Sequence, residues 1–235
     1  MSIKDDYYIA PVDNKTANDV VQRCHYAHRR ASAVRSFGLF SKSPNRLVGV
    51  VIYGISASHS VEKSICGEEE SRNVYELTRL YVDDGLPKNL ESYLVGNTLK
   101  LLDKELIISY SDTACNHIGV VYQATNFLYT GLSHGSIDFE EIDENGNRLH
   151  NKYMFVKYGG AENIRNAMNH NPNIKMIERS RKHRYIYINA KGKRKKELLQ
   201  KLQYEVLPYP KQSCSVPITS TENIHDTKST GRRLF

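Results

Sequence analysis

The stretch SYSDTACNHIGVVYQATNFLYTG, residues 109–131, joins the end of an apolar strand to a helical segment. The strand ends in Asp112, and the helical segment that follows carries Tyr122 and several other hydrogen-bonding side chains. Polar side chains just beyond the carboxyl end of a strand are typical of ligand sites in open α/β sheets. No GxGxxG or GxxxxGK[ST] motif accompanies them, so a glycine-rich phosphate loop is not indicated. This corner therefore predicts a site built from side chains.

The segments around the corner have the periodicities of a mixed α/β domain. Strands are expected over 6–12, 36–41, 46–56, 74–82, 105–112 and 184–189, with a hairpin over 138–150. Helices are expected over 15–28, with Asn14 as its cap, and over 89–103, 118–128, 161–170 and 195–203. This order predicts a single α/β domain over 1–207, with a mixed central β-sheet flanked by helices. A flexible C-terminal tail is expected over 208–235.

The composition is that of a soluble globular protein. The 235 residues are 40% hydrophobic and 25% charged, and no apolar run approaches the roughly 18 residues of a membrane-spanning helix. The N-terminal MSIKDDYYIA lacks the basic and apolar regions of a secretion signal. The four cysteines are scattered and form no CxxC pair. This favours a reduced, intracellular chain and argues against a zinc site built on cysteine.

Positive charge is concentrated late in the chain. Residues 1–150 hold 15 Lys and Arg against 20 Asp and Glu, a net charge of −5, whereas residues 151–211 hold 15 against 4, a net charge of +11. A basic segment that contains tyrosines is the usual footprint of a nucleic-acid-binding surface, although a solvated helix is the alternative. The basic segment within 151–207 contributes the candidate DNA-binding residues Lys182, His183, Arg184, Lys193, Arg194, Lys195 and Lys196.

Several motifs in a fixed order give the chain a resemblance to a known family. They are HYAHRR (25–30), FGLF with LVGVVIYG (37–54), VYELTRLYVDD (74–84), NLESYL (89–94), the 109–131 corner and KHRYIYI (182–188). Together they resemble the phage Mom family of the GNAT acyltransferase-like superfamily. The resemblance implies a GNAT-like fold and an enzyme of the bacterial host cytoplasm. The implied reaction is carbamoylmethylation of adenine N6 in phage DNA, which protects that DNA from host restriction enzymes.

The resemblance also implies which residues carry the chemistry. Adenine N6 is a weak nucleophile, and inside a duplex it is paired. The base must therefore be flipped out or single-stranded, oriented in a pocket and relieved of a proton. By motif, the catalytic candidates are His25, Arg79, Ser92, Asp112 and Tyr122. The substrate-binding candidates are His117, Gln123, Asn126 and Tyr129.

Several of these residues also have a purely structural interpretation. Asp112 would cap the helix that follows it, and Tyr122 would fill the core. Arg79 shares its strand face with apolar neighbours, so its partner would be Glu91, Asp112, the donor or a DNA phosphate. His25 is either a structural histidine or, with Asp112 and Tyr122, a ligand of a ferrous-type ion.

The donor is left open by the sequence. GNAT enzymes hold the CoA pyrophosphate with a Q/R-x-x-G-x-G/A loop, but the corresponding stretch, VDDGLPKNLESYLVGN (82–97), lacks that motif. Asp83 and Asp84 would repel a pyrophosphate. Ser92 either hydrogen-bonds the donor or is a helix-surface serine. The candidate donors are an acyl-CoA and an aminoacyl-tRNA-type species, and iron is a candidate cofactor.

Two other functions compete with a DNA-adenine-modifying transferase. A non-enzymatic DNA-binding protein on the same fold would explain the basic segment, but the polar residues of 109–131 argue against it. An acyl-CoA-dependent N-acyltransferase for a small amine or a protein would explain the fold, but the missing pyrophosphate motif argues against it. The leading prediction is therefore the transferase, with DNA as its partner, no membrane association, and a homodimer as an open alternative.

Overall fold

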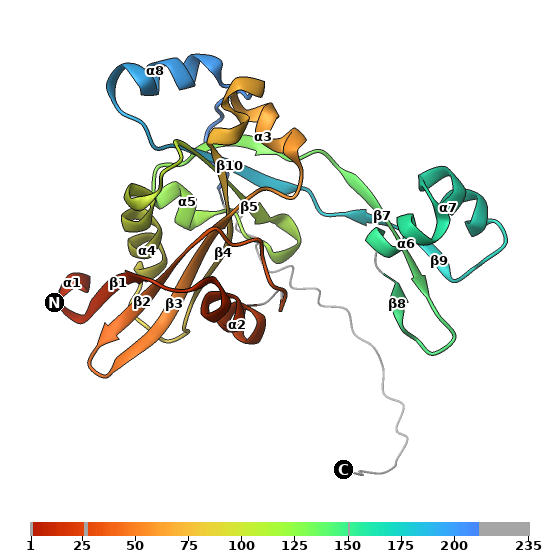
Figure 1. The fold of residues 1–235 in the computed structure, drawn as a ribbon, viewed down its shortest axis with the longest axis horizontal. Coiled ribbons are helices and arrows are strands. Elements are labelled where there is room, and N and C mark those ends of the chain that lie inside the picture. Colours follow the sequence, from red (N-terminus) through yellow and green to blue (C-terminus); the bar gives the residue numbers. More distant parts are fainter. Residues whose placement is uncertain (1, 26–27, 150, 212–235) are drawn as a thin grey trace, which may run out of the picture.

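A mixed β-sheet lies at the centre of the protein (Figure 1). The computed structural model describes residues 2–25, 28–149 and 151–211. Helices pack on both faces of the sheet, which confirms the mixed sheet flanked by helices that the sequence predicts. Residues 212–235, most of the expected tail, lie outside the described residues, and Cys214 is among them. The cysteines within the described residues, Cys24, Cys66 and Cys115, are free.

The elements have the following bounds. The strands are β1 (Tyr7–Pro11), β2 (Arg35–Lys42), β3 (Asn45–Gly54), β4 (Val74–Val82), β5 (Leu106–Asp112), β6 (Leu128–Leu132), β7 (Ser136–Ile142), β8 (Arg148–Leu149), β9 (Ile174–Arg179) and β10 (Lys182–Ile188). The α-helices are α1 (Ile3–Asp6), α2 (Asn14–Cys24), α3 (His59–Cys66), α4 (Leu90–Thr98), α5 (Val120–Ala124), α6 (Asn151–Tyr158), α7 (Ala161–Met168) and α8 (Gly192–Lys201). The 3₁₀ helices are η1 (Glu68–Asn73), η2 (Leu99–Leu101) and η3 (Thr113–Cys115). Within the described ranges, none of these helices is long and apolar enough to cross a membrane.

The seven strands of the main sheet lie in the order β1-β2-β3-β4-β5-β10-β6. Only β4 and β5 are parallel, and the other neighbouring pairs are antiparallel. Side chains alternate between the faces: Tyr75 packs with Leu90 and Leu94 of α4, whereas Val74 packs with α3 and α8. The helices α4 and α5 therefore cover one face, and α2, α3 and α8 cover the other.

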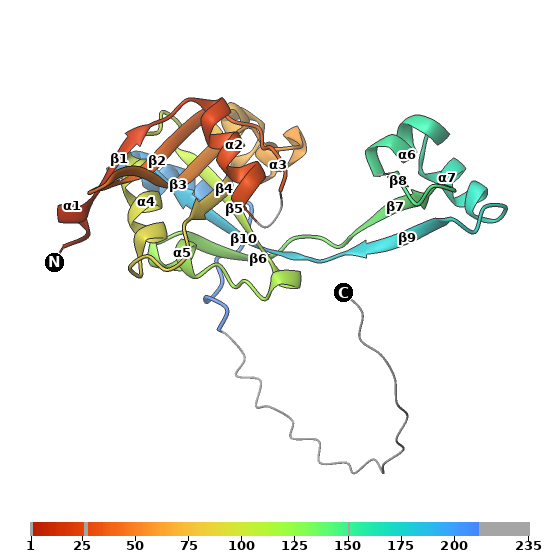
Figure 2. The same cartoon turned by 90° about the horizontal axis from the view of Figure 1, so that it is seen from below.

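A second, three-stranded sheet forms an arm that projects from the core (Figures 1 and 2). Its strand order is β8-β7-β9, and α6 and α7 lie on one side of it. The arm, residues 136–179, has its own small core of Phe139, Met154, Ile164 and Ile174. Because β6 leads into β7 and β9 leads into β10, the arm is an insertion between two strands of the main sheet.

Several helices are shorter than the sequence predicts, and two of them lie at the ends of the predicted site. The helix expected over 15–28 ends at Cys24, and its cap is Asp13, which accepts a hydrogen bond from the Thr16 N–H at 2.9 Å. Asn14, the expected cap, lies inside the helix and donates to the Ala33 carbonyl. The helix expected over 118–128 covers only Val120–Ala124. The chain turns there through Asn126, whose φ of 62° is left-handed, and enters the unexpected strand β6.

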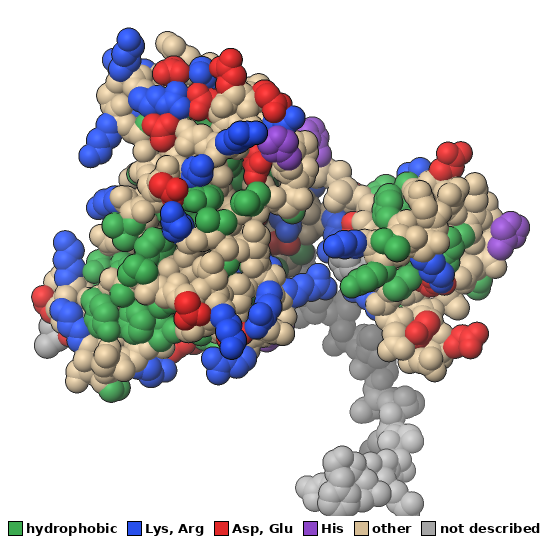
Figure 3. Space-filling view, in the orientation of Figure 1, with side chains coloured by type: hydrophobic (Ala, Val, Ile, Leu, Met, Phe, Trp, Pro, Cys, Tyr) green, Lys and Arg blue, Asp and Glu red, His purple; other side chains and the backbone are tan. Residues whose placement is uncertain are grey.

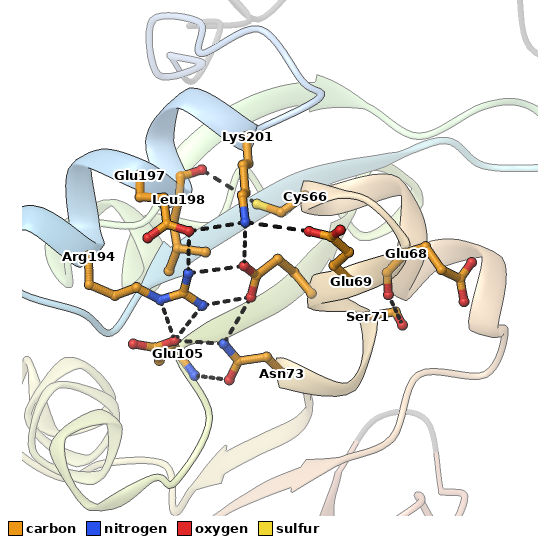
Figure 4. Close-up of polar contacts among 11 residues, drawn as sticks. Cys66, Glu68, Glu69, Ser71, Asn73, Glu105, Arg194, Glu197, Leu198 and Lys201 are labelled. Atoms are coloured by element: carbon orange, nitrogen blue, oxygen red, sulfur yellow. Dashed lines mark hydrogen bonds and ion pairs between the residues drawn. The ribbon is translucent and has the colours of Figure 1, made fainter.

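The helix α8 is fastened to the main sheet by a cluster of ion pairs (Figure 4). Arg194 donates to Glu70 of η1 at 2.7 Å and to Glu105, just before β5, at 2.9 Å. Lys201 also donates to Glu70, at 3.0 Å, and the Glu70 side chain is only 9% exposed. The Arg194 hydrogen bond is the largest cause that lowers the pKa of Glu70 to about 2. This cluster is named the Arg194 brace.

The Arg194 brace predicts a stability defect for Arg194→Met. This change leaves the buried Glu70 carboxylate with fewer donors and should lower the free energy of unfolding by about 1–3 kcal/mol, measured by urea denaturation at pH 7. Lys195→Met, an exposed position on the same helix, is the matched control. The pKa of Glu70 is lowered from 4.5 to about 2. The brace therefore stabilises the folded protein fully above pH 4.5, and this contribution is lost as Glu70 becomes protonated between pH 4.5 and about 2. Equal stability of the two variants would contradict this prediction.

Candidate functional site

The main sheet splits between β4 and β5. The two strands pair from Val74–Leu106 to Leu77–Ser109 and no further. The next residue of β4, Thr78, is an extra residue against β3, since Tyr53 faces Leu77 whereas Ile52 faces Arg79. Such a bulge bends its strand and increases the local twist. Beyond it β4 follows β3, while β5 stays paired with β10 as far as Asp112.

A cavity of about 620 Å³ fills this split. Its walls are the separated ends of β4 and β5, and α5 and the end of α2 close it from opposite faces of the sheet. The polar residues of its lining are Cys24, His25, Glu76, Thr78, Arg79, Tyr81, Asp84, Glu91, Tyr110, Ser111, Asp112, Asn116, His117, Tyr122 and Lys182. Residues from both faces of the sheet therefore contribute to the lining of the cavity.

The split brings together four of the five catalytic candidates. His25, Arg79, Asp112 and Tyr122 all line the cavity, although they come from four different elements or connections. Ser92 lies elsewhere. It lines a separate hollow of about 430 Å³, and its hydroxyl donates to the Asn89 carbonyl at 3.0 Å.

The two carboxylate oxygens of Asp112 have different partners. Its Oδ1 accepts from the Ser180 hydroxyl at 2.6 Å and from the Ala114 N–H at 2.9 Å. Its Oδ2 lies 3.9 Å from the Lys182 ammonium. Burial alone would raise the pKa of Asp112, but the two hydrogen bonds and the charge of Lys182 hold it below its ordinary value. Asp112 is therefore ionised at neutral pH, and it caps η3 while it lines the cavity.

Arg79 carries an unsatisfied donor into the site. Its Nη1 donates to the Thr78 carbonyl at 2.6 Å. Its Nε is buried, and no hydrogen-bond acceptor for it lies among the described residues. A buried guanidinium N–H without an acceptor is costly, so this position suits an acceptor atom supplied by a ligand.

His25 is held in its neutral form. The side chain is 8% exposed, and this burial is the main cause that lowers its pKa to about 4, helped by the positive charge of Arg79. At neutral pH the imidazole therefore keeps one N–H donor and one lone pair.

Tyr122 stands at the edge of an aromatic cluster. Its ring centroid lies 5.3 Å from that of Tyr185 and 5.4 Å from that of Phe127. Gly119 allows this packing, because its φ is +74° and a Cβ there would lie 2.4 Å from the Tyr185 ring. One face of Tyr122 thus packs against the core, and the residue also lines the cavity.

The substrate-binding candidates divide between the cavity and the scaffold. His117 lines the cavity and is exposed. Gln123 donates to the Ile118 carbonyl at 2.9 Å and to the Tyr185 hydroxyl at 3.1 Å, which holds the corner together. Tyr129 is buried and hydrogen-bonds His183 at 2.9 Å. Asn126 forms the left-handed turn into β6 and lines the smaller hollow.

Glu76 is a cavity residue that the sequence analysis missed. It lies on β4 opposite Ile108, one pair before the split. Burial raises the pKa of its carboxyl, against the positive charges of Lys182 and Arg79. Burial and the charge of Glu76 in turn raise the pKa of Tyr110 to about 12. The signal in the sequence was an acidic residue inside the apolar strand VYELTRLYV.

A metal site receives no geometric support from this arrangement. Among the residues that the structure describes, no group of three or more His, Cys, Asp and Glu is placed to hold a metal ion. His25, Asp112 and Tyr122 share the cavity, but Oδ1 of Asp112 already accepts two hydrogen bonds. The ferrous ligand set of His25, Asp112 and Tyr122 therefore has no support here beyond the shared cavity.

The DNA-binding candidates lie in two places. Lys182 is at the cavity, whereas Arg184 is 8% exposed, donates to Thr130 and lies over the Tyr204 ring. His183 is half-buried against Tyr129. The remaining four, Lys193, Arg194, Lys195 and Lys196, lie on α8, where Arg194 belongs to the brace.

Comparison with known proteins gives one family. Residues 6–211 match the Mom protein family. The methylcarbamoylase Mom of Escherichia phage Mu is 32% identical over 203 residues, which cover 83% of this chain and 80% of that protein.

Solved acetyltransferase structures are more distant. A GNAT-family acetyltransferase from Bacillus cereus is 10% identical with a TM-score of 0.43, covering 79% of this chain and 99% of that one. NAA60 of Arabidopsis thaliana in complex with acetyl-CoA is 10% identical with a TM-score of 0.44, covering 77% and 98%. The sequence matches are decisive, and they show that this chain belongs to the Mom protein family.

Proposed function

We propose that this protein transfers a carbamoylmethyl group to N6 of adenine in DNA and so protects phage DNA from restriction. The observation that carries the proposal is the cavity in the β4–β5 split, which gathers His25, Arg79 and Asp112 in a member of the Mom family. The name of the phage Mu relative, methylcarbamoylase, supports the chemical class of the transferred group.

In this proposal the two sides of the sheet serve the two reactants. The cavity is lined by α2 on one face and by α4 and α5 on the other. A flipped adenine enters from the side of Asp112 and Lys182, and the donor enters from the side of Asp84 and Glu91. The two reactants then meet in a space that excludes most water, which lowers the entropic cost of the transfer.

The transfer needs one proton acceptor and one donor. N6 attacks the methylene carbon of the donor, the N6–C bond forms, and the leaving group departs with the electrons of its bond to that carbon. The N6 proton passes to a carboxylate at the cavity wall. The Nε–H of Arg79, which has no acceptor among the described residues, stabilises negative charge that develops on the leaving group. Tyr122 offers a ring face and a hydroxyl to the adenine.

Asp112 and Glu76 are the two carboxylates suited to accept that proton. Asp112 is ionised and orients N6 through Oδ2, but its lowered pKa makes it a weak base. Glu76 has a raised pKa, which brings it nearer to the range in which a general base is most effective. We therefore assign orientation of N6 to Asp112 and proton acceptance to Glu76.

The donor pocket is a poor fit for a CoA diphosphate. In the loop after β4, Asp83 pairs with Arg46 at 3.0 Å and accepts from the Tyr81 hydroxyl at 3.0 Å. The next residue, Asp84, and Glu91 of α4 line the cavity itself. Carboxylates at this end repel a diphosphate and attract a positively charged donor.

The function is tested by mass spectrometry of nucleosides from a bacterial host that expresses the chain. A deoxyadenosine adduct carrying one carbamoylmethyl group is expected. Unmodified deoxyadenosine, with soluble protein present, would refute the proposal, and an adduct on another base would refute the adenine assignment.

The first prediction concerns Asp112→Asn. Asn keeps an acceptor for Ser180 and Ala114 but loses the charge that orients N6, so the fold persists while the adduct yield falls by roughly 10²-fold. DNA affinity should change little, because phosphate contacts dominate it. Nucleoside mass spectrometry and DNA binding are measured side by side.

Tyr122→Phe, which removes only a hydroxyl, shows whether that hydroxyl acts in the reaction or the ring alone suffices. Wild-type adduct yields from both variants would move the active site away from the corner.

The second prediction concerns the pH dependence of Glu76. A general base must be ionised, so the modification rate should rise with pH through the pKa of Glu76, which lies above its ordinary 4.5. Glu76→Gln should lower the rate by about 10²-fold and abolish that limb of the profile. Initial rates on a DNA oligonucleotide between pH 5 and 8 give the test. A variant that keeps the wild-type profile would show that Glu76 is a structural residue.

The third prediction concerns acetyl-CoA. Because Asp84 and Glu91 face the donor end of the cavity, isothermal titration of the purified protein should show weak binding or none. Asp84→Asn combined with Glu91→Gln removes two negative charges and should strengthen whatever binding exists. Sub-micromolar binding to the unmodified protein would restore the ordinary acyltransferase as the better proposal.

A further inference from the structure

We propose that DNA binds in the hollow between the core and the arm, across the mouth of the cavity, and that the basic helix α8 takes no part in binding. The proposed contacts are Arg181 and Lys182 at the root of the arm and His28 and Arg29 after α2. This inference rests on the proposed function, since it names the surface by which that site receives its substrate.

The root of the arm is built into the site. The Ser180 hydroxyl donates to Asp112, and the Thr113 hydroxyl donates to the Arg181 carbonyl at 2.7 Å. The Lys182 N–H donates to the Ser133 hydroxyl at 2.9 Å. These bonds tie the two strands that enter the arm to the end of β5. A DNA strand held at the arm root therefore lies directly beside the cavity.

The arm root presents positive charge to solvent. Arg181 is exposed, and although its Nε donates to the Ser133 carbonyl at 2.7 Å, the rest of the guanidinium remains available for a phosphate. Lys182 has a side chain that is 49% exposed, and its partner Asp112 is 3.9 Å away. Among the described residues, neither cation has a carboxylate partner closer than 3.9 Å, so both can neutralise phosphates.

The opposite rim of the cavity is also cationic. The chain leaves α2 through Cys24 and His25, which line the cavity, and continues to the exposed residues His28 and Arg29. Burial lowers the pKa of His25, and the charges of Arg79, His28 and His117 lower it further, so these cationic groups lie near His25. Figure 3 shows Lys and Arg side chains on both sides of the hollow between the core and the arm.

Two of the α8 cations have a structural role. Arg194 and Lys201 are engaged by Glu70, Glu105 and Glu197. The helix packs against α3, and Figure 1 shows α8 at the end of the core opposite to the arm. The net charge of the late segment therefore overstates its role in binding.

The shape of the hollow favours duplex DNA as the occupant. Two separated cationic rims match the two phosphate backbones that flank a groove, and the cavity between them is positioned for a base that leaves the stack. Phosphate contacts release counterions, so each rim cation adds to the salt dependence of binding.

The experiment compares two double variants of the full chain with equal loss of charge. Arg181→Gln/Lys182→Gln removes the arm-root pair, and Lys195→Gln/Lys196→Gln removes an exposed pair from α8. Fluorescence anisotropy with a labelled adenine-containing duplex is measured over a series of salt concentrations. The arm-root variant should bind about 10- to 100-fold more weakly, with a slope of log affinity against log salt smaller by about 2. The α8 variant should stay within about twofold of the wild type.

Arg29→Gln gives an independent check from the other rim. It should weaken binding and reduce the salt slope by about 1, and it does not depend on the folding of the arm. Loss of affinity in the α8 variant, with the arm-root and Arg29 variants unchanged, would overturn the inference. Preferential binding of an RNA hairpin that these variants abolish would assign the hollow to an RNA and would also overturn it.

The outcomes separate this inference from the proposed function. If host DNA carries the adenine adduct and the rim variants bind and modify DNA normally, the interface is wrong and the function stands. If the rim variants lose DNA binding but the wild-type protein forms no adduct, the interface stands and the function is wrong.

Discussion

The separation of β4 from β5 after Leu77 is the constraint on which the rest of the structure depends. A sheet that stayed paired to the end of β4 would place Arg79 and Asp112 in a continuous surface and leave no cavity. The extra residue Thr78 bends β4 toward β3, and its hydroxyl donates to the Ile52 carbonyl at 3.1 Å, which fixes the bend. The site thus depends on a shift of one residue in the pairing of β4 with β3. His25 and Tyr122 complete the site from opposite faces of the sheet.

The Arg194 brace holds β4 and β5 together at the end of the sheet where the two strands are paired. Glu70 lies just before β4, and Glu105 lies just before β5. Arg194 binds both carboxylates, and Asn73 adds hydrogen bonds to the Glu105 side chain at 2.7 Å and to its N–H at 2.9 Å. The strands β4 and β5 are therefore held together where they begin and separated from each other where they end. Arg194 and Lys201 of α8 therefore help to hold the walls of the cavity in place.

The sequence allowed the corner, most strands and the family to be predicted because these depend on local patterns. Asp112 at a strand end and the apolar runs around it are visible without a partner. The brace was not predictable, because Arg194 and Glu70 are 124 residues apart and a basic run has the same pattern whether it binds DNA or carboxylates. The bulge at Thr78 and the role of Glu76 also depend on which strand lies alongside, and that is tertiary information. The sequence pattern of the arm is that of ordinary helices and strands, because it does not reveal that these elements form a separate sheet.

Asp112 shows why a structural and a catalytic role need not compete. Its Oδ1 accepts from Ala114 and Ser180, so the carboxylate caps η3 and holds the root of the arm. Its Oδ2 is left toward Lys182 and the cavity. A planar carboxylate held at one oxygen has its second oxygen fixed in direction. In the proposed reaction, the cap would therefore orient the group that meets N6. Contact of DNA with the arm root would act on Ser180 and Lys182, the same residues that position this carboxylate. Substrate binding and alignment of the site are then linked through one side chain.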